Sequence, residues 1–210
     1  MAALRQALKP APETQALAVF GALHETGDTI ILLGPHEPGF WAHFSASPEY
    51  RDGLADPLDR YSKRAIGLLA AAWGGTAVFP SDGPPFAPFM AWAMASGQAW
   101  QSPVGMLVHA SAGLMVSYRG AVRLSGELDL AAPAARPCDT CVEKPCLTAC
   151  PVSALNESQR YDVALCKSHI STADGEICMS AGCLTRRACP VSARYGRRPA
   201  QSAFHMKSFL

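Results

Sequence analysis

Eight cysteines in two related spacings are the residues of this chain that could do chemistry. All of them lie between Cys138 and Cys189 of the 210 residues. The first run reads C-x2-C-x4-C-x3-C-P and the second C-x11-C-x4-C-x5-C-P; the members are Cys138, Cys141, Cys146, Cys150, Cys166, Cys178, Cys183 and Cys189. Clustered cysteines in a reducing compartment are metal ligands more often than disulfides. We therefore expect two [4Fe–4S] clusters on eight thiolates, with zinc and disulfides as the alternatives.

Both runs end in Cys-Pro, which favours iron–sulfur clusters. Zinc ribbons usually contain two C-x2-C pairs, and this chain has one. The runs resemble that of bacterial ferredoxins, C-x2-C-x2-C-x3-C-P, whose fourth cysteine serves the other cluster. Three closely spaced cysteines surround one cluster, and the fourth points at its neighbour where Pro turns the chain. We therefore predict two crossed ligand sets, the first being Cys138, Cys141, Cys146 and Cys189, and the second Cys150, Cys166, Cys178 and Cys183.

The second run partly repeats the first. Cys146-Leu-Thr-Ala-Cys150-Pro-Val-Ser-Ala154 is matched by Cys183-Leu-Thr-Arg-Arg-Ala-Cys189-Pro-Val-Ser-Ala193. His169 lies between two cysteines, where it either tunes a cluster by hydrogen bonding or lies on the surface. Five basic residues accompany the second run, namely Arg186, Arg187, Arg194, Arg197 and Arg198. They indicate either a docking surface for an acidic redox partner or a solvated helix face and tail.

The rest of the chain must position these cysteines. We expect an N-terminal α+β domain over residues 1–131 and an iron–sulfur domain over residues 132–210, joined by an Ala/Pro-rich linker. Strands are predicted at Ala16–Leu23, Thr29–Leu33, Gly105–Val108 and Leu114–Leu124, and helices at Ala2–Leu8, Asp56–Trp73 and Phe86–Ala99. The Asp56–Trp73 helix has the clearest signals, with Asp56 as N-cap, Pro57 at the first position and Gly74-Gly75 at the end.

A stretch without Asp, Glu, Lys or Arg runs from Asp82 to Arg119. It is long enough for a membrane helix, but several prolines interrupt it, so we interpret it as buried core or the wall of an apolar pocket. Its larger apolar side chains are Phe86, Phe89, Met90, Trp92, Met94, Trp100 and Met106. The N-terminus lacks a convincing signal peptide, and we expect a cytoplasmic protein. The net charge of +1 argues against nucleic-acid binding by bulk charge.

Two family resemblances extend this interpretation. The cysteine runs with their Cys-Pro endings resemble the ferredoxin module of epoxyqueuosine reductases and reductive dehalogenases. Leu54–Asp59 and Gly105–Leu124 are similar to segments of the cobalamin-processing proteins. This second resemblance implies a nitroreductase-like α+β domain that binds a corrinoid or flavin, with His109, Tyr118 and Arg119 as cofactor-binding residues. Phe79 stands where that family has a His before a Pro, which puts corrinoid coordination in doubt.

Three functions are compatible with these patterns. The first is an electron-transfer protein that serves a redox partner. The second is a reductase whose clusters supply electrons to a corrinoid or flavin bound by the N-terminal domain. A cobalamin reductase or processing enzyme would be of this kind. The third is a non-catalytic binding module in which metal only stabilises the fold. No catalytic residue can be named from the sequence.

Overall fold

The computed structural model describes residues 8–158 and 160–210, which fold into two compact units. The sheet unit comprises the described residues up to Gln98 together with Ser117–Ala134. The cysteine unit comprises Ala99–Val116 and Ala135–Leu210. Ala99–Val116, which the sequence analysis assigned to the 1–131 domain, thus packs with the cysteine runs. The helix predicted over Ala2–Leu8 lies outside the described residues, apart from Leu8.

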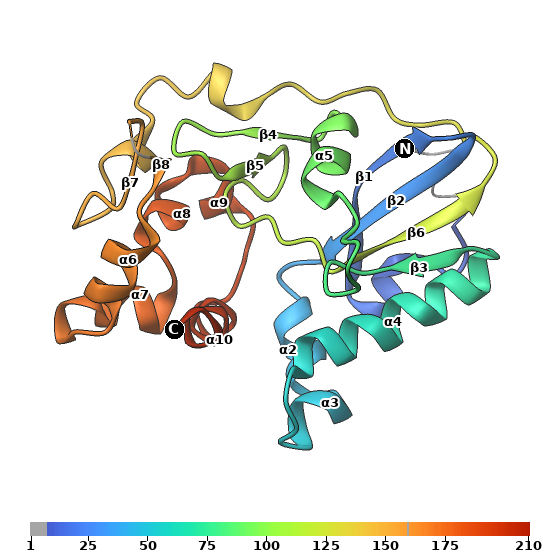
Figure 1. The fold of residues 1–210 in the computed structure, drawn as a ribbon, viewed down its shortest axis with the longest axis horizontal. Coiled ribbons are helices and arrows are strands. Elements are labelled where there is room, and N and C mark those ends of the chain that lie inside the picture. Colours follow the sequence, from blue (N-terminus) through green and yellow to red (C-terminus); the bar gives the residue numbers. More distant parts are fainter. Residues whose placement is uncertain (1–7, 159) are drawn as a thin grey trace. The chain divides into compact units, whose positions relative to one another are not determined.

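A four-stranded antiparallel sheet forms the centre of the sheet unit (Figure 1). Its order is β1-β2-β6-β3, with bounds Leu17–Glu25, Asp28–Pro35, Gly120–Ser125 and Thr76–Val78. The first two strands were predicted. They form a hairpin whose two turn residues, Thr26 and Gly27, both have positive φ, as the right-handed twist of a tight hairpin requires. With the helices described below, the sheet confirms the predicted mixed α+β class.

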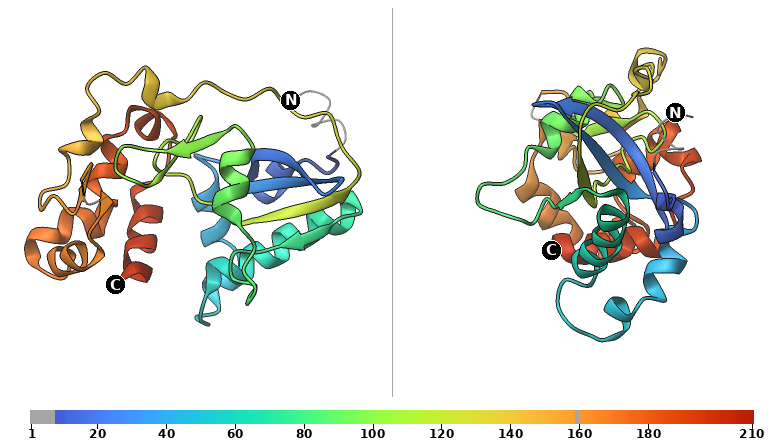
Figure 2. Two further views of the ribbon diagram at one scale, coloured as in Figure 1. Left: turned by 45° about the horizontal axis from the view of Figure 1, so that its top comes forward. Right: turned by 90° about the vertical axis from the view of Figure 1, so that its right-hand side faces the viewer.

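Helix α4, Pro57–Trp73, is the longest helix and matches its prediction closely. Figure 2 shows it lying along one face of the sheet, and it packs against β6 and β3. Its inward face buries Leu58, Tyr61, Ala65, Ile66 and Leu69 at helical spacing. Gly74 ends the helix in the left-handed conformation, as predicted. Asp56 occupies the N-cap position, also as predicted, but it is left-handed and its side chain makes no cap hydrogen bond.

Two predicted elements are shorter than expected. The helix predicted over Phe86–Ala99 is α5, Phe89–Ala95, because Pro88 precedes it and Gly97 follows with positive φ. Ala99 belongs to β4 instead. The strand predicted over Leu114–Leu124 begins only at Gly120. The backbone N–H and C=O of Leu114 bond the side chains of Ser192 and Arg186 rather than a neighbouring strand. The remaining elements of the sheet unit are η1 (Pro12–Gln15), α2 (Phe40–Ser45) and α3 (Pro48–Arg51).

The cysteine unit consists of short elements around a small apolar core. A hairpin of β4 (Ala99–Gln101) and β5 (Leu107–His109) carries Val104 and Val108, which pack with Cys146 and Cys189. The elements that follow are η2 (Pro137–Asp139), η3 (Pro145–Leu147), β7 (Leu155–Asn156), β8 (Arg160–Tyr161), α6 (Val163–Ile170), η4 (Ala173–Gly175), α7 (Glu176–Ala181), α8 (Leu184–Ala188), α9 (Pro190–Arg194) and α10 (Pro199–Phe209). Helix α10 packs against α7.

The uncharged stretch from Asp82 to Arg119 is divided between the two units. Phe89 and Trp92 are buried in the sheet unit, while Trp100 and Met106 pack in the core of the cysteine unit. Phe86, Met90 and Met94 are exposed. The stretch therefore contributes to the cores of both units and also carries exposed apolar side chains. Among the described helices, none combines the length and apolar character needed to cross a bilayer.

Candidate metal centres

Four cysteines line one cavity of the cysteine unit. This first cavity has a volume of about 420 Å³ and is lined by Cys138, Cys141, Cys146 and Cys189. Three of these belong to the first run, and η2 and η3 position two of them. The fourth is the last cysteine of the second run and stands between α8 and α9.

The other four cysteines line the second cavity, which is narrower, about 20 Å³. They are Cys150, Cys166, Cys178 and Cys183. Cys150 is the last cysteine of the first run, and the others are carried by α6, by α7 and by the start of α8. The two cavities thus group the cysteines in the crossed sets that the spacing predicts. All eight thiols are free of disulfide bonds.

The Cys-Pro pairs produce this crossing. A residue before Pro is disfavoured in the helical conformation. Cys189 is accordingly extended, with φ −63° and ψ 123°; α8 ends just before it, and α9 begins at Pro190. After Cys150-Pro151 the chain turns through Ser153, which has positive φ, and the Ala154 N–H then donates to Cys150 Sγ at 3.3 Å.

Contacts between residues far apart in the sequence hold these turns in place. Ser192, one turn after Cys189, accepts a hydrogen bond from the Leu114 N–H at 2.8 Å. The Arg186 guanidinium donates to the Leu114 carbonyl at 2.7 Å, and that of Arg197 donates to the Met115 carbonyl at 3.0 Å. Beside the second cavity, Gly182 precedes Cys183 and has φ +92°. A Cβ on Gly182 would meet Ser202 of α10 at 2.6 Å. These contacts therefore tie the turns beside Cys189 and Cys183 to distant parts of the unit.

Burial affects the thiols directly. Desolvation raises the pKa values of Cys138 and Cys146 in the first set and of Cys166 and Cys178 in the second. Without a cation these buried thiols stay protonated at neutral pH. Because metal ligands must be thiolates, loading either site releases protons and is favoured as pH rises.

Three buried polar atoms line the cavities without a hydrogen-bond partner among the described residues. Nε2 of His169 and Oγ1 of the fully buried Thr185 border the second cavity. Oγ of Ser102 borders the first. An unpaired buried donor is costly, about 1–3 kcal/mol. Cluster sulfurs and thiolates accept hydrogen bonds, so the two hydroxyls and the sets of four thiols have the chemistry that an iron–sulfur cluster requires, while the second cavity, at about 20 Å³, leaves little open space between its thiols.

Sequence reasoning considered His169 but missed Ser102 and Thr185. The internal repeat carried a signal for Thr185, since Thr148 occupies the same place after Cys146. Thr148 is exposed and donates to the Pro145 carbonyl, however, so the repeat alone does not separate the two. Ser102 is remote from every cysteine in sequence and offered no signal.

A zinc ion and a four-iron cluster place different demands on four thiols. Zinc binds four sulfurs at about 2.3 Å from one point, whereas the thiolates of a four-iron cluster bind separate irons. Among the described His, Cys, Asp and Glu side chains, no group of three or more is arranged to bind one metal ion.

The three residues proposed for an organic cofactor lie in different units. His109, on β5, belongs to the cysteine unit and is buried; its Nδ1 accepts from the N–H groups of Ser111 and Ala112 at 3.2 and 3.3 Å. Tyr118 and Arg119 belong to the sheet unit. His109 Nδ1 thus stabilises the turn that follows it, while Tyr118 and Arg119 are adjacent residues of the sheet unit.

Arg119 borders a cavity of about 230 Å³ in the sheet unit. Its guanidinium donates to Asp59 at 2.6 Å and to Ser62 at 3.2 Å, and burial lowers its pKa. Phe79 is part of the same wall. The Tyr118 hydroxyl is buried without a partner among the described residues, and burial raises its pKa.

Comparison with known proteins finds no match: no family model, no curated protein and no solved structure is similar to this chain.

Proposed function

We propose that this protein is a one-electron carrier with two [4Fe–4S] clusters. The observation that carries the proposal is the sorting of eight free cysteines into two sets of four, each around its own cavity. When bound, each cluster supplies a centre that accepts and releases one electron. The chain supplies four thiolates per cluster, apolar packing around the first set, and polar donors beside both.

The finer fold assignments belong to this proposal. The cysteine unit corresponds to a ferredoxin-like two-cluster domain, and the sheet unit to a nitroreductase-like domain. Support for the former comes from the crossed ligand sets, and for the latter from the β1-β2-β6-β3 sheet with α4 packed on it. A reducing, cytoplasmic compartment fits eight unpaired cysteines.

Metal analysis after anaerobic purification tests the proposal. We expect about eight irons and eight acid-labile sulfides per chain, the content of two four-iron clusters. Stoichiometric zinc, or iron near zero, contradicts it. Zinc-bound or metal-stabilised protein without redox activity would instead support the non-catalytic binding module.

The crossing has its own test. Cys189→Ser should remove the signal of the first-set cluster, and Cys183→Ser that of the second, with electron paramagnetic resonance of the reduced protein distinguishing them. If Cys189→Ser abolishes the same signal as Cys183→Ser and leaves the other intact, the ligand sets follow the sequence runs and the crossing is wrong.

A second candidate is a corrinoid- or flavin-linked reductase. Two observations favour it: the unpaired Tyr118 hydroxyl and the cavity beside Arg119. At about 230 Å³ this cavity is smaller than the roughly 300–1,000 Å³ of typical small-molecule sites, so a large cofactor would lie partly outside it. Titration with hydroxocobalamin and with FMN tests this candidate. A saturable spectral change that Arg119→Gln weakens supports it, and a flat response to both leaves the electron carrier.

A further inference from the structure

The five arginines near the second run do not form one surface. The guanidinium groups of Arg186 and Arg197 bond the backbone carbonyls of Leu114 and Met115 inside the cysteine unit. Their role is to fix the chain near Cys189. Arg187 and Arg198 are exposed but do not line either cavity. Of the five, only Arg194 borders a cysteine cavity.

The first cavity has a cationic rim. Lys144 and Arg194 both line it, both are exposed, and neither forms an ion pair with any described carboxylate. No Asp or Glu lines it. Asp139 and Glu143 occur on the same loop but outside the lining, and Asp139 lies 3.7 Å from Arg136.

The two cavities differ in how a partner could approach. The first is about 420 Å³ against about 20 Å³ for the second, although each is bordered by four cysteines. The first cavity is therefore the more open of the two, and its thiols are the more accessible from outside. Val142, next to Cys141, is 92% exposed and offers an apolar contact at this rim. Among the described side chains, no Lys or Arg lines the second cavity, and Met206 of α10 forms part of its wall.

We propose that the first cavity is the electron port of this protein, and that it docks an acidic redox protein through Lys144 and Arg194. This inference rests on the proposed function. Carboxylates on the partner would pair with the two unpaired cations, while Val142 contacts its surface. Such charge complementarity mainly raises the association rate and selects the partner. The sequence of the cysteine unit agrees, with ten Lys and Arg against six Asp and Glu.

Electron transfer to two probe proteins of opposite charge tests the port. The cluster-loaded protein is reduced and mixed with acidic plastocyanin or with basic cytochrome c, and stopped-flow absorbance follows each reaction. In each encounter one reduced cluster loses one electron and the acceptor metal gains it. The double variant Lys144→Glu/Arg194→Glu is compared with Arg198→Glu/Lys207→Glu, which makes the same charge change at exposed sites outside the cavity lining. Oxidation by neutral benzoquinone checks that the driving force is unchanged.

We expect the port variant to react at least about tenfold more slowly with plastocyanin and faster with cytochrome c, because steering changes association rates by roughly 10–10³-fold. The control variant should stay within about twofold of wild type for both, and rising salt should erase the differences. Equal rates for wild type and port variant, or an equal loss in the control variant, overturn the proposal. Iron analysis precedes the kinetics. A protein that contains no clusters refutes the proposed function, and this outcome is distinguished in that way from a failure of the electron-port proposal alone.

Discussion

Gly113 lies directly against Cys189. A Cβ built on Gly113 would stand 3.1 Å from Cys189 Sγ and 2.5 Å from the backbone nitrogen of Ser192. Gly113 also has φ +57°, in the left-handed region. The backbone after β5 thus approaches the cysteine at the Cys-Pro turn as closely as a residue without a side chain allows. This contact positions the one thiol that the second run contributes to the first cavity.

Gly113→Ala should therefore remove the first cluster while leaving the second. The new methyl group meets backbone, which cannot rotate away as a side chain can. We expect iron to fall from about eight to about four per chain, measured together with the resonance signals of the reduced protein. Gly126→Ala is the matched control, since Gly126 has φ +86° but nothing within 4 Å of its Cβ position. It should cost about 1–2 kcal/mol of stability from backbone strain alone and keep all the iron. Full iron content in Gly113→Ala would show that this contact does not position Cys189.

Thr185→Val should lower the reduction potential of the second cluster. Hydrogen bonds to cluster sulfurs favour the more negative reduced state, and Val keeps the shape of Thr while removing the buried hydroxyl. Redox titration followed by paramagnetic resonance measures both potentials. Thr148→Val, at the corresponding exposed position of the repeat, should leave both unchanged. An unaltered second potential in Thr185→Val means that the hydroxyl does not reach the cluster.

Local signals accounted for the parts of the fold that were predicted well. Pro57 at the start and Gly74 at the end of α4 are independent of the rest of the molecule, and so is the turn between β1 and β2. The Cys-Pro turn is also local, since α8 ends before Cys189 and α9 begins at Pro190; the ligand sets themselves stay a prediction.

Contacts between distant residues account for what was missed. Leu114 alternates with its neighbours like a strand residue, yet Ser192 and Arg186, more than seventy positions away, take its backbone groups. The burial of Thr185 and Ser102 depends in the same way on elements far along the chain. His109 looked like a cofactor contact beside Tyr118 because sequence order cannot show that the chain passes from one unit to the other between them.

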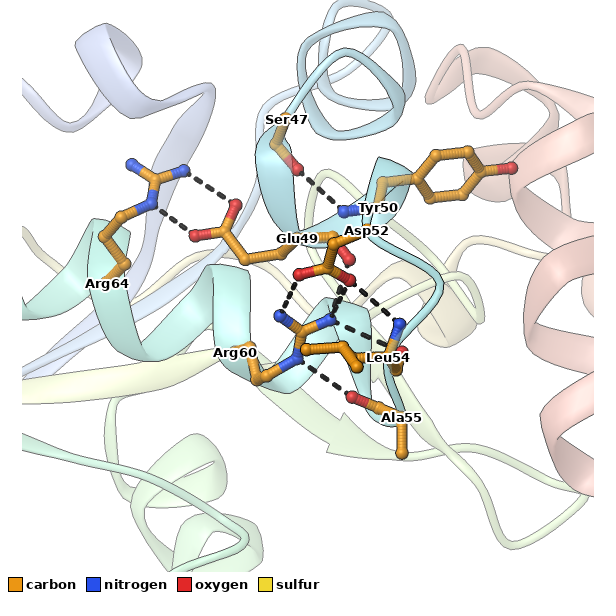
Figure 3. Close-up of polar contacts among 8 residues, drawn as sticks. All are labelled: Ser47, Glu49, Tyr50, Asp52, Leu54, Ala55, Arg60 and Arg64. Atoms are coloured by element: carbon orange, nitrogen blue, oxygen red, sulfur yellow. Dashed lines mark hydrogen bonds and ion pairs between the residues drawn. The ribbon is translucent and has the colours of Figure 1, made fainter.

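An ion-pair network braces the segment between α3 and α4 in the sheet unit (Figure 3). Arg60 donates to both carboxylate oxygens of Asp52 at 2.7 Å and to the backbone carbonyls of Glu49 and Ala55 at 2.9 Å. Arg64 pairs with the Glu49 carboxylate through two nitrogens. Glu49 is buried, and these hydrogen bonds from Arg64 lower its pKa to about 2.

Glu49→Gln should make the stability of the sheet unit less sensitive to acid. The folded carboxyl has a pKa of about 2 against an ordinary 4.5, so its contribution is complete above pH 4.5 and is lost as pH falls toward 2. We expect the variant to lose about 1 kcal/mol at pH 7, because Arg64 is partly exposed and its pairing is screened by solvent. The difference in free energy of unfolding between the variant and wild type should shrink progressively below pH 4.5. Urea unfolding followed by the fluorescence of Trp41, Trp73 and Trp92 measures it, with Glu127→Gln, at an exposed carboxyl, as control. A difference in free energy of unfolding that is constant with pH would contradict the lowered pKa of Glu49.

Two tyrosines of the sheet unit, Tyr61 and Tyr118, provide the sharpest comparison. The Tyr61 hydroxyl donates to the Gln15 carbonyl at 2.6 Å, whereas the Tyr118 hydroxyl has no partner among the described residues. Tyr61→Phe should therefore lower the free energy of unfolding by about 1 kcal/mol, the net value of one hydrogen bond. Tyr118→Phe should leave it unchanged or raise it by a similar amount, since it removes a buried polar atom that gains nothing in the folded protein. Its ring contact with Phe20, edge-on at 5.9 Å between centroids, is retained. Equal losses in the two variants would mean that Tyr118 has a hydrogen-bond partner in solution. Loss of hydroxocobalamin or FMN binding in Tyr118→Phe, with stability intact, would identify that partner as the cofactor of the reductase candidate.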